Sequence, residues 1–453
     1  MTSHHWRPQS HYSPAEIVDI DTSVRAQPRR ELREVEHIFR IEALHLEWDI
    51  AVKTFTPADL AERAGSPDGR NTGFLLLHGG ASDLQAMEPL ARELAGRHGH
   101  TALAMSFPGR HYLPDPSRKW PGDTIASNGT VRTPIWLEGE EITADQYDVI
   151  EDVSMKVRYG TRTLARAKPG TLFYDRMAAW PMAFENAMIE ACERFFPDPE
   201  WWVFTNGHST GGAFSALITQ RVANIAGQTE IETAPIGYIN QRKHGAPHVP
   251  GQAADAGQVE LANRTDAFHD LSIRTWRDLA RYTGYEAMRA EGEKSLERLA
   301  WMMEDVLGSW DQAKSQPNFK AEFPVTHNVV GSLESAARAV ADRLDLDDAA
   351  TEELVEHYRG YGRYDVRPGA KPVPPILYIN TNHSRDNTPE AFNGVILPML
   401  NELDPAPRVW LITLGAGTHT YYSAGEDLPA GMVPLVAQIF STAIDEGFFE
   451  SAS

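Results

Sequence analysis

The sequence has little cysteine and no long hydrophobic run. The one cysteine among 453 residues is Cys192, so an intramolecular disulfide and a structural zinc site built on several thiolates are both excluded. No stretch of 18 apolar residues exists, which is the length that a membrane-spanning helix requires. The first 30 residues lack the apolar segment of a secretory signal. These absences predict a cytoplasmic protein with no membrane partner.

Basic residues are also in deficit. Lys and Arg number 42 against 63 Asp and Glu, which gives a formal net charge of −21. Such a chain repels nucleic acid and anionic lipid, so neither is an expected partner. Phosphate-loop and H-E-x-x-H motifs are absent, and we expect no metal and no organic cofactor. Cys192 lies in an apolar stretch with helical character, which favours a buried structural thiol over a nucleophile.

Hydrophobic periodicity indicates strands that alternate with helices. Residues 38–42 and 48–55 alternate in the manner of strands, which predicts an antiparallel pair. Apolar runs at 73–77 and 101–107 flank a stretch with helical spacing, as in a βαβ unit with parallel strands. Further strands are predicted at 201–205, 236–239, 375–380 and 408–414, and further helices near 177–195, 389–403 and 432–444.

Two long insertions interrupt this alternation. We expect residues 1–35 to form an extended arm, because they are polar and lack periodicity. Residues 36–240 form the first part of an α/β core, with an insertion at about 110–171, and residues 372–453 form its second part. The segment 241–371 shows no obvious strand and is predicted to be a helical cap or lid. Its apparent helices lie near 271–284, 294–307, 333–344 and 349–358.

The most informative motif is Gly207-His208-Ser209-Thr210-Gly211. A G-x-S-x-G sequence alone is weak, but this one lies between an apolar strand and an amphipathic helical stretch at about 214–222. In that context it predicts a nucleophile elbow, a sharp turn that exposes the serine hydroxyl. Glycines are needed around such a turn because the strand and the helix pass closely. Ser209 is therefore the candidate nucleophile.

A serine hydroxyl needs a base, and the base needs an orienting carboxylate. His419 follows the last predicted strand, and Asp386 follows the strand before it. Loops at the carboxyl edge of a parallel sheet are where such side chains collect. The resulting order of Ser209, Asp386 and His419 is the order that this architecture requires. Glu390 is the main rival acid, but it is expected in the first turn of the next helix.

An oxyanion hole needs two backbone N–H groups. One is expected from Thr210, directly after the nucleophile, and the second from the loop after the strand at 73–77. Gly80 is the preferred donor there, with Ala81 as the fallback. His78 could also take part, but a structural hydrogen bond within the loop is favoured.

Together these pieces resemble the α/β-hydrolase superfamily. The resemblance covers segments 72–110, 172–240 and 372–447, and is carried by the loop at His78 and Gly80, the elbow, Asp386 and His419. It implies an α/β-hydrolase fold, with a mostly parallel central sheet flanked by helices and a mainly helical cap insertion. It also implies a serine hydrolase that cleaves an ester-type bond through an acyl-enzyme. An acyltransferase with the same triad and a non-catalytic ligand-binding protein are the alternatives.

The substrate class stays open at this stage. Ester, thioester, lactone, carbamate and amide bonds all suit a serine nucleophile, whereas a serine in place of an aspartate at the elbow argues against epoxide hydrolase or dehalogenase chemistry. The insertions contain several tryptophans. Most are expected to anchor the insertions' own cores, but one or two could line an apolar or aromatic acyl pocket. A small apolar or aromatic molecule is the expected substrate, and the oligomeric state is undetermined.

Overall fold

The structure is a computed structural model of the whole chain. The residues that it describes are 9–60, 70–79, 84–108, 144–157, 160–167, 170–208, 210–215, 218–232, 333–360, 369–381, 397–401, 403–417 and 432–450.

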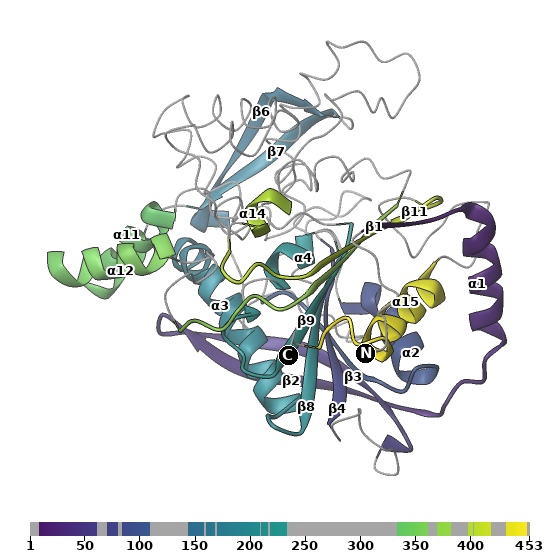
Figure 1. Cartoon of the computed structure of the whole chain (residues 1–453). Coiled ribbons are helices and arrows are strands. Elements are labelled where there is room, and N and C mark those ends of the chain that lie inside the picture. The colour runs from purple at the N-terminus through teal and green to yellow at the C-terminus, as the bar shows by residue number, and fades with distance from the viewer. Residues whose placement is uncertain are drawn as a thin grey trace.

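The described residues build a central sheet of nine strands in the order β1-β11-β10-β9-β8-β4-β5-β3-β2 (Figure 1). Neighbours are parallel except at β2–β3 and β3–β5, so β3 alone runs against the others. The strands are β1 (Gln9–Tyr12), β2 (Leu32–Ala43), β3 (Leu46–Pro57), β4 (Asn71–Leu77), β5 (Thr101–Met105), β8 (Trp201–His208), β9 (Ile225–Ile231), β10 (Ile376–Thr381) and β11 (Val409–Leu414).

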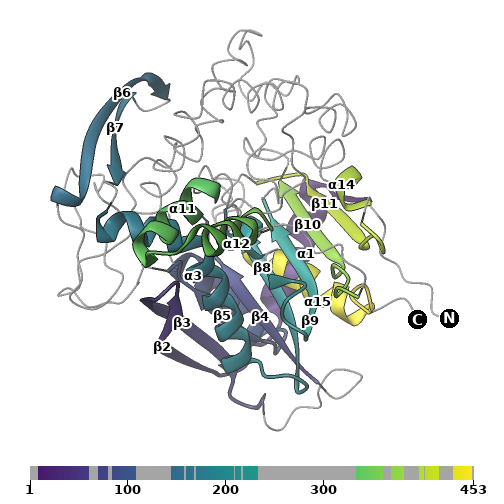
Figure 2. The same cartoon turned by 90° about the vertical axis from the view of Figure 1, so that its left-hand side faces the viewer.

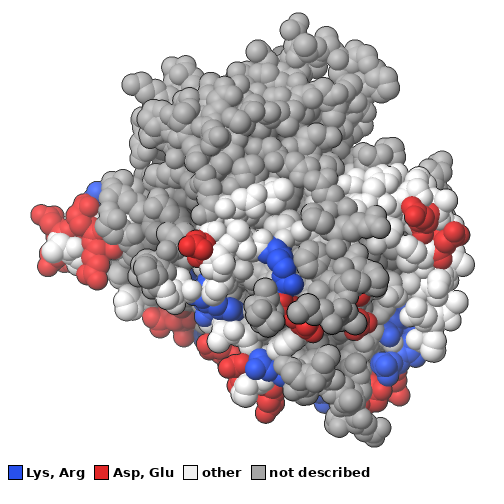
Figure 3. Space-filling view, in the orientation of Figure 1, with Lys and Arg blue, Asp and Glu red and all other residues white. Residues whose placement is uncertain are grey.

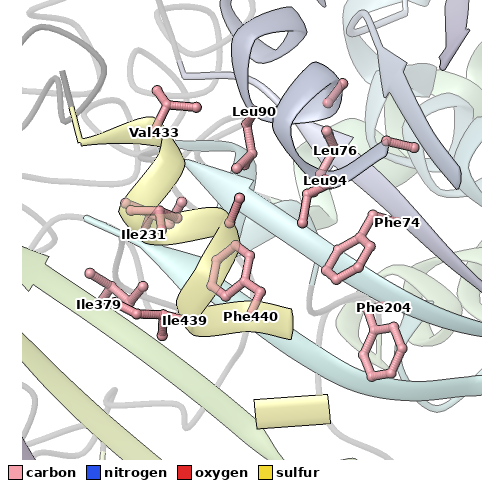
Figure 4. Packing of buried hydrophobic residues seen from close by; sticks show 14 of the residues in the cluster. Phe74, Leu76, Leu90, Leu94, Phe204, Ile231, Ile379, Val433, Ile439 and Phe440 are labelled. Atoms are coloured by element: carbon pink, nitrogen blue, oxygen red, sulfur yellow. The ribbon is translucent and has the colours of Figure 1, made fainter. Parts of the chain in front are cut away.

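Helices cover both faces of the sheet. On one face α2 (Glu88–Gly96) and α15 (Val433–Asp445) pack together over the central strands, and α1 (Pro14–Ala26) packs against α15. Figure 4 shows Phe74 and Leu76 of β4 beside Leu90 and Leu94 of α2 and Phe440 of α15. The sheet and these helices thus form one continuous apolar core.

The other face carries α3 (Leu172–Phe195), which packs on β2 and β3. Cys192 of this helix is fully buried, which confirms its expected role as a packed, structural thiol. The short helix α4 (Thr210–Ser215) follows β8 directly. The predicted antiparallel pair, the βαβ unit and the strands at 201–205, 375–380 and 408–414 are all present as predicted.

The prediction of an extended arm at the N-terminus is wrong for residues 9–26. β1 adds a parallel strand to β11, and Trp410 Nε1 donates a hydrogen bond of 2.9 Å to Ser10 Oγ. Helix α1 begins with a capping box between Ser13 and Glu16 and buries Ile17 and Val24. The short strand and the helix were missed because their apolar side chains are few and far apart.

The strand that follows α4 among the described residues was not predicted from the sequence. β9 spans Ile225–Ile231, whereas the predicted strand at 236–239 lies outside the described residues. Among the described residues α4 ends at Ser215 and gives way to turns before β9, so the predicted helix does not continue to 222.

The insertion at 110–171 contains a regular element that the sequence pattern did not reveal. After a short 3-10 helix, η3 (Ala144–Gln146), β6 (Tyr147–Val157) and β7 (Gly160–Ala167) form a separate two-stranded antiparallel sheet. It lies away from the central sheet in both views (Figures 1 and 2).

Two helices of the predicted cap are described, α11 (Leu333–Leu344) and α12 (Asp348–Gly360). They match the helices predicted near 333–344 and 349–358, and the other predicted cap helices lie outside the described residues. α11 packs against α3, where Arg343 Nε lies 3.3 Å from Asp175 Oδ2. Acidic side chains gather on the projection that α11 and α12 form (Figure 3); the exposed ones are Asp342, Asp345, Asp347, Asp348, Glu352 and Glu353.

Candidate active site

The strand and the helix that flank the predicted elbow are present at the predicted place. β8 ends at His208 and α4 begins at Thr210, so Ser209 is the single residue between a buried strand and a helix. β8 lies in the middle of the sheet, between β4 and β9. Ser209 itself is not among the residues that the structure describes.

Glycines make this turn possible because side chains would collide there. A Cβ built on Gly207 would lie 2.0 Å from the Cα of Gly212, and a Cβ on Gly211 would lie 2.5 Å from the carbonyl oxygens of Leu77 and His78. Strand, helix and the end of β4 therefore meet at contact distances that only glycine allows. The sequence-based interpretation of these glycines is confirmed.

His78 holds the loop that follows β4. Phe107 N–H donates to His78 Nε2 at 3.3 Å, which requires the tautomer with the proton on Nδ1. Nδ1 in turn donates to the carbonyl of Gly79 at 2.7 Å, and the imidazole stacks on the Phe107 ring with centroids 3.9 Å apart. The side chain is fully buried. His78 thus makes the structural hydrogen bond to the loop that the sequence favoured.

A buried polar network connects α4 to β9. Glu230 of β9 contacts Ser215 Oγ of α4 and accepts a 2.6 Å hydrogen bond from Gln228 Nε2. Ser215 Oγ also donates to the carbonyl of Gly212 at 2.8 Å. Burial raises the pKa of Glu230 to about 8, against the lowering effect of these two hydrogen bonds. A protonated Glu230 can donate to Ser215 while Ser215 donates to Gly212, so the neutral acid fits the network.

Most of the other predicted site residues lie outside the described ranges. These are Asp386, His419, Gly80, Ala81 and Glu390. The segments that carry them begin at one edge of the sheet, because β4, β8, β10 and β11 are parallel and each ends just before its segment. Thr210 is the first residue of α4, directly after Ser209. The segments that were predicted to carry the nucleophile, base, acid and oxyanion loop therefore all start from a common edge.

Glu232 is a residue of this edge that sequence reasoning missed. It directly follows β9 and is fully buried. Its backbone has φ 53°, a left-handed conformation that is uncommon outside glycine, and its carboxylate accepts a hydrogen bond from Thr381 N–H at the end of β10. It was missed because β9 and its end at Ile231 were not recognised from the sequence.

Three features identify the fold. They are the strand order, the single reversed strand β3 and the serine that follows β8. The chain has the α/β-hydrolase fold. No family model and no curated protein matches the chain.

Among solved structures, α/β-hydrolases are similar over nearly the whole chain. The peroxisomal α/β-hydrolase Lpx1 of Saccharomyces cerevisiae has 11% identity, covers 93% of this chain and 91% of its own, and has a TM-score of 0.37. A thermostable esterase from Pseudomonas putida has 12% identity, coverage of 98% and 92%, and a TM-score of 0.37. The Francisella virulence factor BioJ has 11% identity, coverage of 96% and 93%, and the same TM-score.

Two features are absent from the described ranges. No helix there is long and apolar enough to cross a lipid bilayer. Within the same ranges, His, Cys, Asp and Glu side chains form no group of three or more that could hold a metal ion.

Proposed function

We propose that the protein is a serine hydrolase that cleaves a carboxylic ester-type bond of a small apolar or aromatic molecule. The observation that carries this proposal is the elbow. Ser209 lies at a strand-to-helix turn whose glycines, Gly207 and Gly211, have no room for a side chain. A turn this tight supports an exposed hydroxyl at the carboxyl edge of the sheet.

In the proposed mechanism, Ser209 Oγ attacks the substrate carbonyl while His419 accepts the hydroxyl proton. The same imidazole then gives the proton to the leaving group, and water hydrolyses the acyl-enzyme. Asp386 is the acid that the sequence order supports, and Glu232 is a second carboxylate at the same edge.

Stabilisation of the oxyanion is assigned to the N–H groups of Thr210 and Gly80, with Ala81 as the alternative donor. Two contacts support this assignment. His78 fixes the start of the loop that leads to Gly80, and the same loop abuts Gly211 of the elbow. The loop and the first residue of α4 are thus neighbours.

Labelling with a fluorophosphonate tests the function directly. The wild-type protein should form a covalent adduct at Ser209 and should hydrolyse short-chain or aryl esters. Ser209→Ala should lose the adduct and lower kcat by about 10⁴-fold or more, while circular dichroism shows a retained fold. A mutant that keeps most of its activity would refute the assignment. A product ester formed from an added alcohol would identify an acyltransferase instead.

A further inference from the structure

Strand pairing places Glu232 directly after the partner of His208, the residue that precedes the proposed nucleophile. His208, the last residue of β8, is paired with Ile231, the last residue of β9. The next residue of each strand is Ser209 and Glu232, respectively. Neighbouring strands lie roughly 4.8 Å apart, so Glu232 follows a strand end that lies one strand away from the end of β8.

The conformation of Glu232 is unusual for a residue that only ends a strand. Its side chain is fully buried, and its φ of 53° is in the left-handed region. A buried carboxylate is unfavourable unless hydrogen-bond donors surround it. Side chains other than glycine that are held in this backbone region are concentrated at functional sites.

The Glu232 side chain reaches the end of β10, the strand next to β11. Thr381 N–H, at the end of β10, donates to Glu232 Oε1, and Glu232 N–H donates to the carbonyl of Ile379 at 2.9 Å. Thr381 is in turn next to the loop after β11, since a Cβ on Gly417 would lie 3.4 Å from Thr381 Cγ2. Glu232, Thr381 and Gly417 therefore form one connected row across three strand ends.

His419 follows Gly417 with one residue between them. That length of chain spans at most about 7 Å, so the segment that carries His419 starts beside Thr381 and the carboxylate that Thr381 binds. Asp386 follows Thr381 with four residues between them. The described contacts therefore fix Glu232 beside the start of the histidine segment, which supports it as the partner of the imidazole.

We propose that Glu232, and not Asp386, is the positioning carboxylate that accepts the imidazole N–H of His419. One oxygen of Glu232 is held by Thr381 N–H, which fixes the position of the carboxylate. The carboxylate holds His419 in the tautomer that can accept the Ser209 proton, and it stabilises the imidazolium that forms. This inference rests on the serine hydrolase function proposed above.

The test compares Glu232→Gln with Asp386→Asn in the full-length protein. Gln keeps an oxygen that can accept from Thr381 N–H, so the change removes the charge but not the structural hydrogen bond. Glu232→Gln should lower kcat by about 10³–10⁴-fold with KM nearly unchanged, as for the loss of a triad acid. Asp386→Asn should stay within about tenfold of wild type.

A pH profile separates positioning from a merely structural role. Without its carboxylate partner the imidazolium is less stable, so the pKa of the histidine falls. The acidic limb of kcat/KM should therefore move to lower pH in Glu232→Gln, and Glu232→Asp should restore part of the rate because Asp keeps the charge and tolerates the left-handed backbone. Glu230→Gln is the matched control, since Glu230 is a buried carboxyl two residues before Glu232 that bonds to Ser215 and Gln228; the acidic limb of its pH profile should match wild type.

Each outcome decides between the two acids. A loss of 10³-fold or more in Asp386→Asn, as expected for a triad acid, overturns the inference even if Glu232→Gln fails to fold. Full activity in Glu232→Gln overturns it as well. These outcomes leave fluorophosphonate labelling of Ser209 intact in the wild type, whereas a wild-type protein that is not labelled at Ser209 refutes the proposed function itself.

Discussion

Gly207 at the end of β8 and Gly212 in α4 are in direct backbone contact. A Cβ on Gly207 would lie 2.0 Å from the Cα of Gly212 and 2.2 Å from its nitrogen. No rotamer change relieves such an overlap, because both clashing atoms are backbone. The close contact at the elbow is therefore made by the backbone of a sheet strand and a helix, and not by a flexible loop.

The first prediction concerns this contact. Gly207→Ala should force β8 and α4 apart, lowering the free energy of unfolding by at least about 1–3 kcal/mol and abolishing ester hydrolysis. Chemical denaturation and esterase assays would measure both effects. Gly96→Ala is the control, because its Cβ would meet nothing closer than 3.8 Å in a helix. That change should be neutral or stabilising by about 0.5–1 kcal/mol. Equal effects of the two changes would contradict the elbow geometry.

The second prediction concerns Glu230 and pH. Burial raises the pKa of Glu230 from 4.5 to about 8 on folding. Between these values the folded state binds more protons than the unfolded state, so stability is greatest below pH 4.5 for this group and falls as pH rises toward 8. Each unit of the shift is worth about 1.4 kcal/mol, and the total is on the order of a few kcal/mol.

Urea denaturation of wild type and Glu230→Gln from pH 5 to pH 8.5 would measure this contribution. The free energy of unfolding should fall with pH more steeply in wild type than in the variant, since the variant lacks the titrating group. Parallel curves for the two proteins would show that Glu230 is ionised in the folded state.

The third prediction tests whether the N-terminal helix belongs to the core. Ile17 is fully buried in the main apolar cluster, whereas Val18 is 46% exposed. Ile17→Ala should lower the free energy of unfolding by about 2–5 kcal/mol. Val18→Ala should change it by less than about 0.5 kcal/mol. Thermal melts of the two variants give the comparison. If Ile17→Ala left the stability unchanged, α1 would not be part of the core.

The fourth prediction concerns the single thiol. Burial raises the pKa of Cys192 to about 12, and a thiol that is neither ionised nor accessible does not react with disulfide reagents. A colourimetric thiol reagent at pH 8 should therefore detect one thiol in denaturant and react at least about 10²-fold more slowly with the native protein. Rapid modification of the native protein would mean that α3 opens away from the sheet.

The sequence revealed those strands whose side chains are uniformly apolar. β4, β5, β10 and β11 are continuous hydrophobic runs because a central parallel strand is buried on both faces. β9 is buried as completely but carries Gln228, Thr229 and Glu230. Their hydrogen bonds to β8, to α4 and to one another replace apolar packing, as in the 3.0 Å bond from Thr229 Oγ1 to the Thr205 carbonyl. No hydrophobic pattern could show this strand.

The candidate site was predictable where a local motif defines it. The glycines of the elbow and the structural role of His78 follow from residue type and spacing, and the contacts of Gly207, Gly211 and His78 confirm them. Glu232 could not be found in this way. Its place at the strand end next to the end of β8 depends on the register between β8 and β9, and register is a property of the assembled sheet.

The pairing of β1 with β11 has a consequence for how the chain is made. Ser10 and Trp410 are joined by a hydrogen bond although 400 positions separate them, so β1 cannot dock until β11 has left the ribosome. Contacts of such long sequence separation form late because closing the intervening chain costs entropy. Until then Ile17 and Val24 of α1 would stay unburied, and the edge of the sheet would be completed only as a last step.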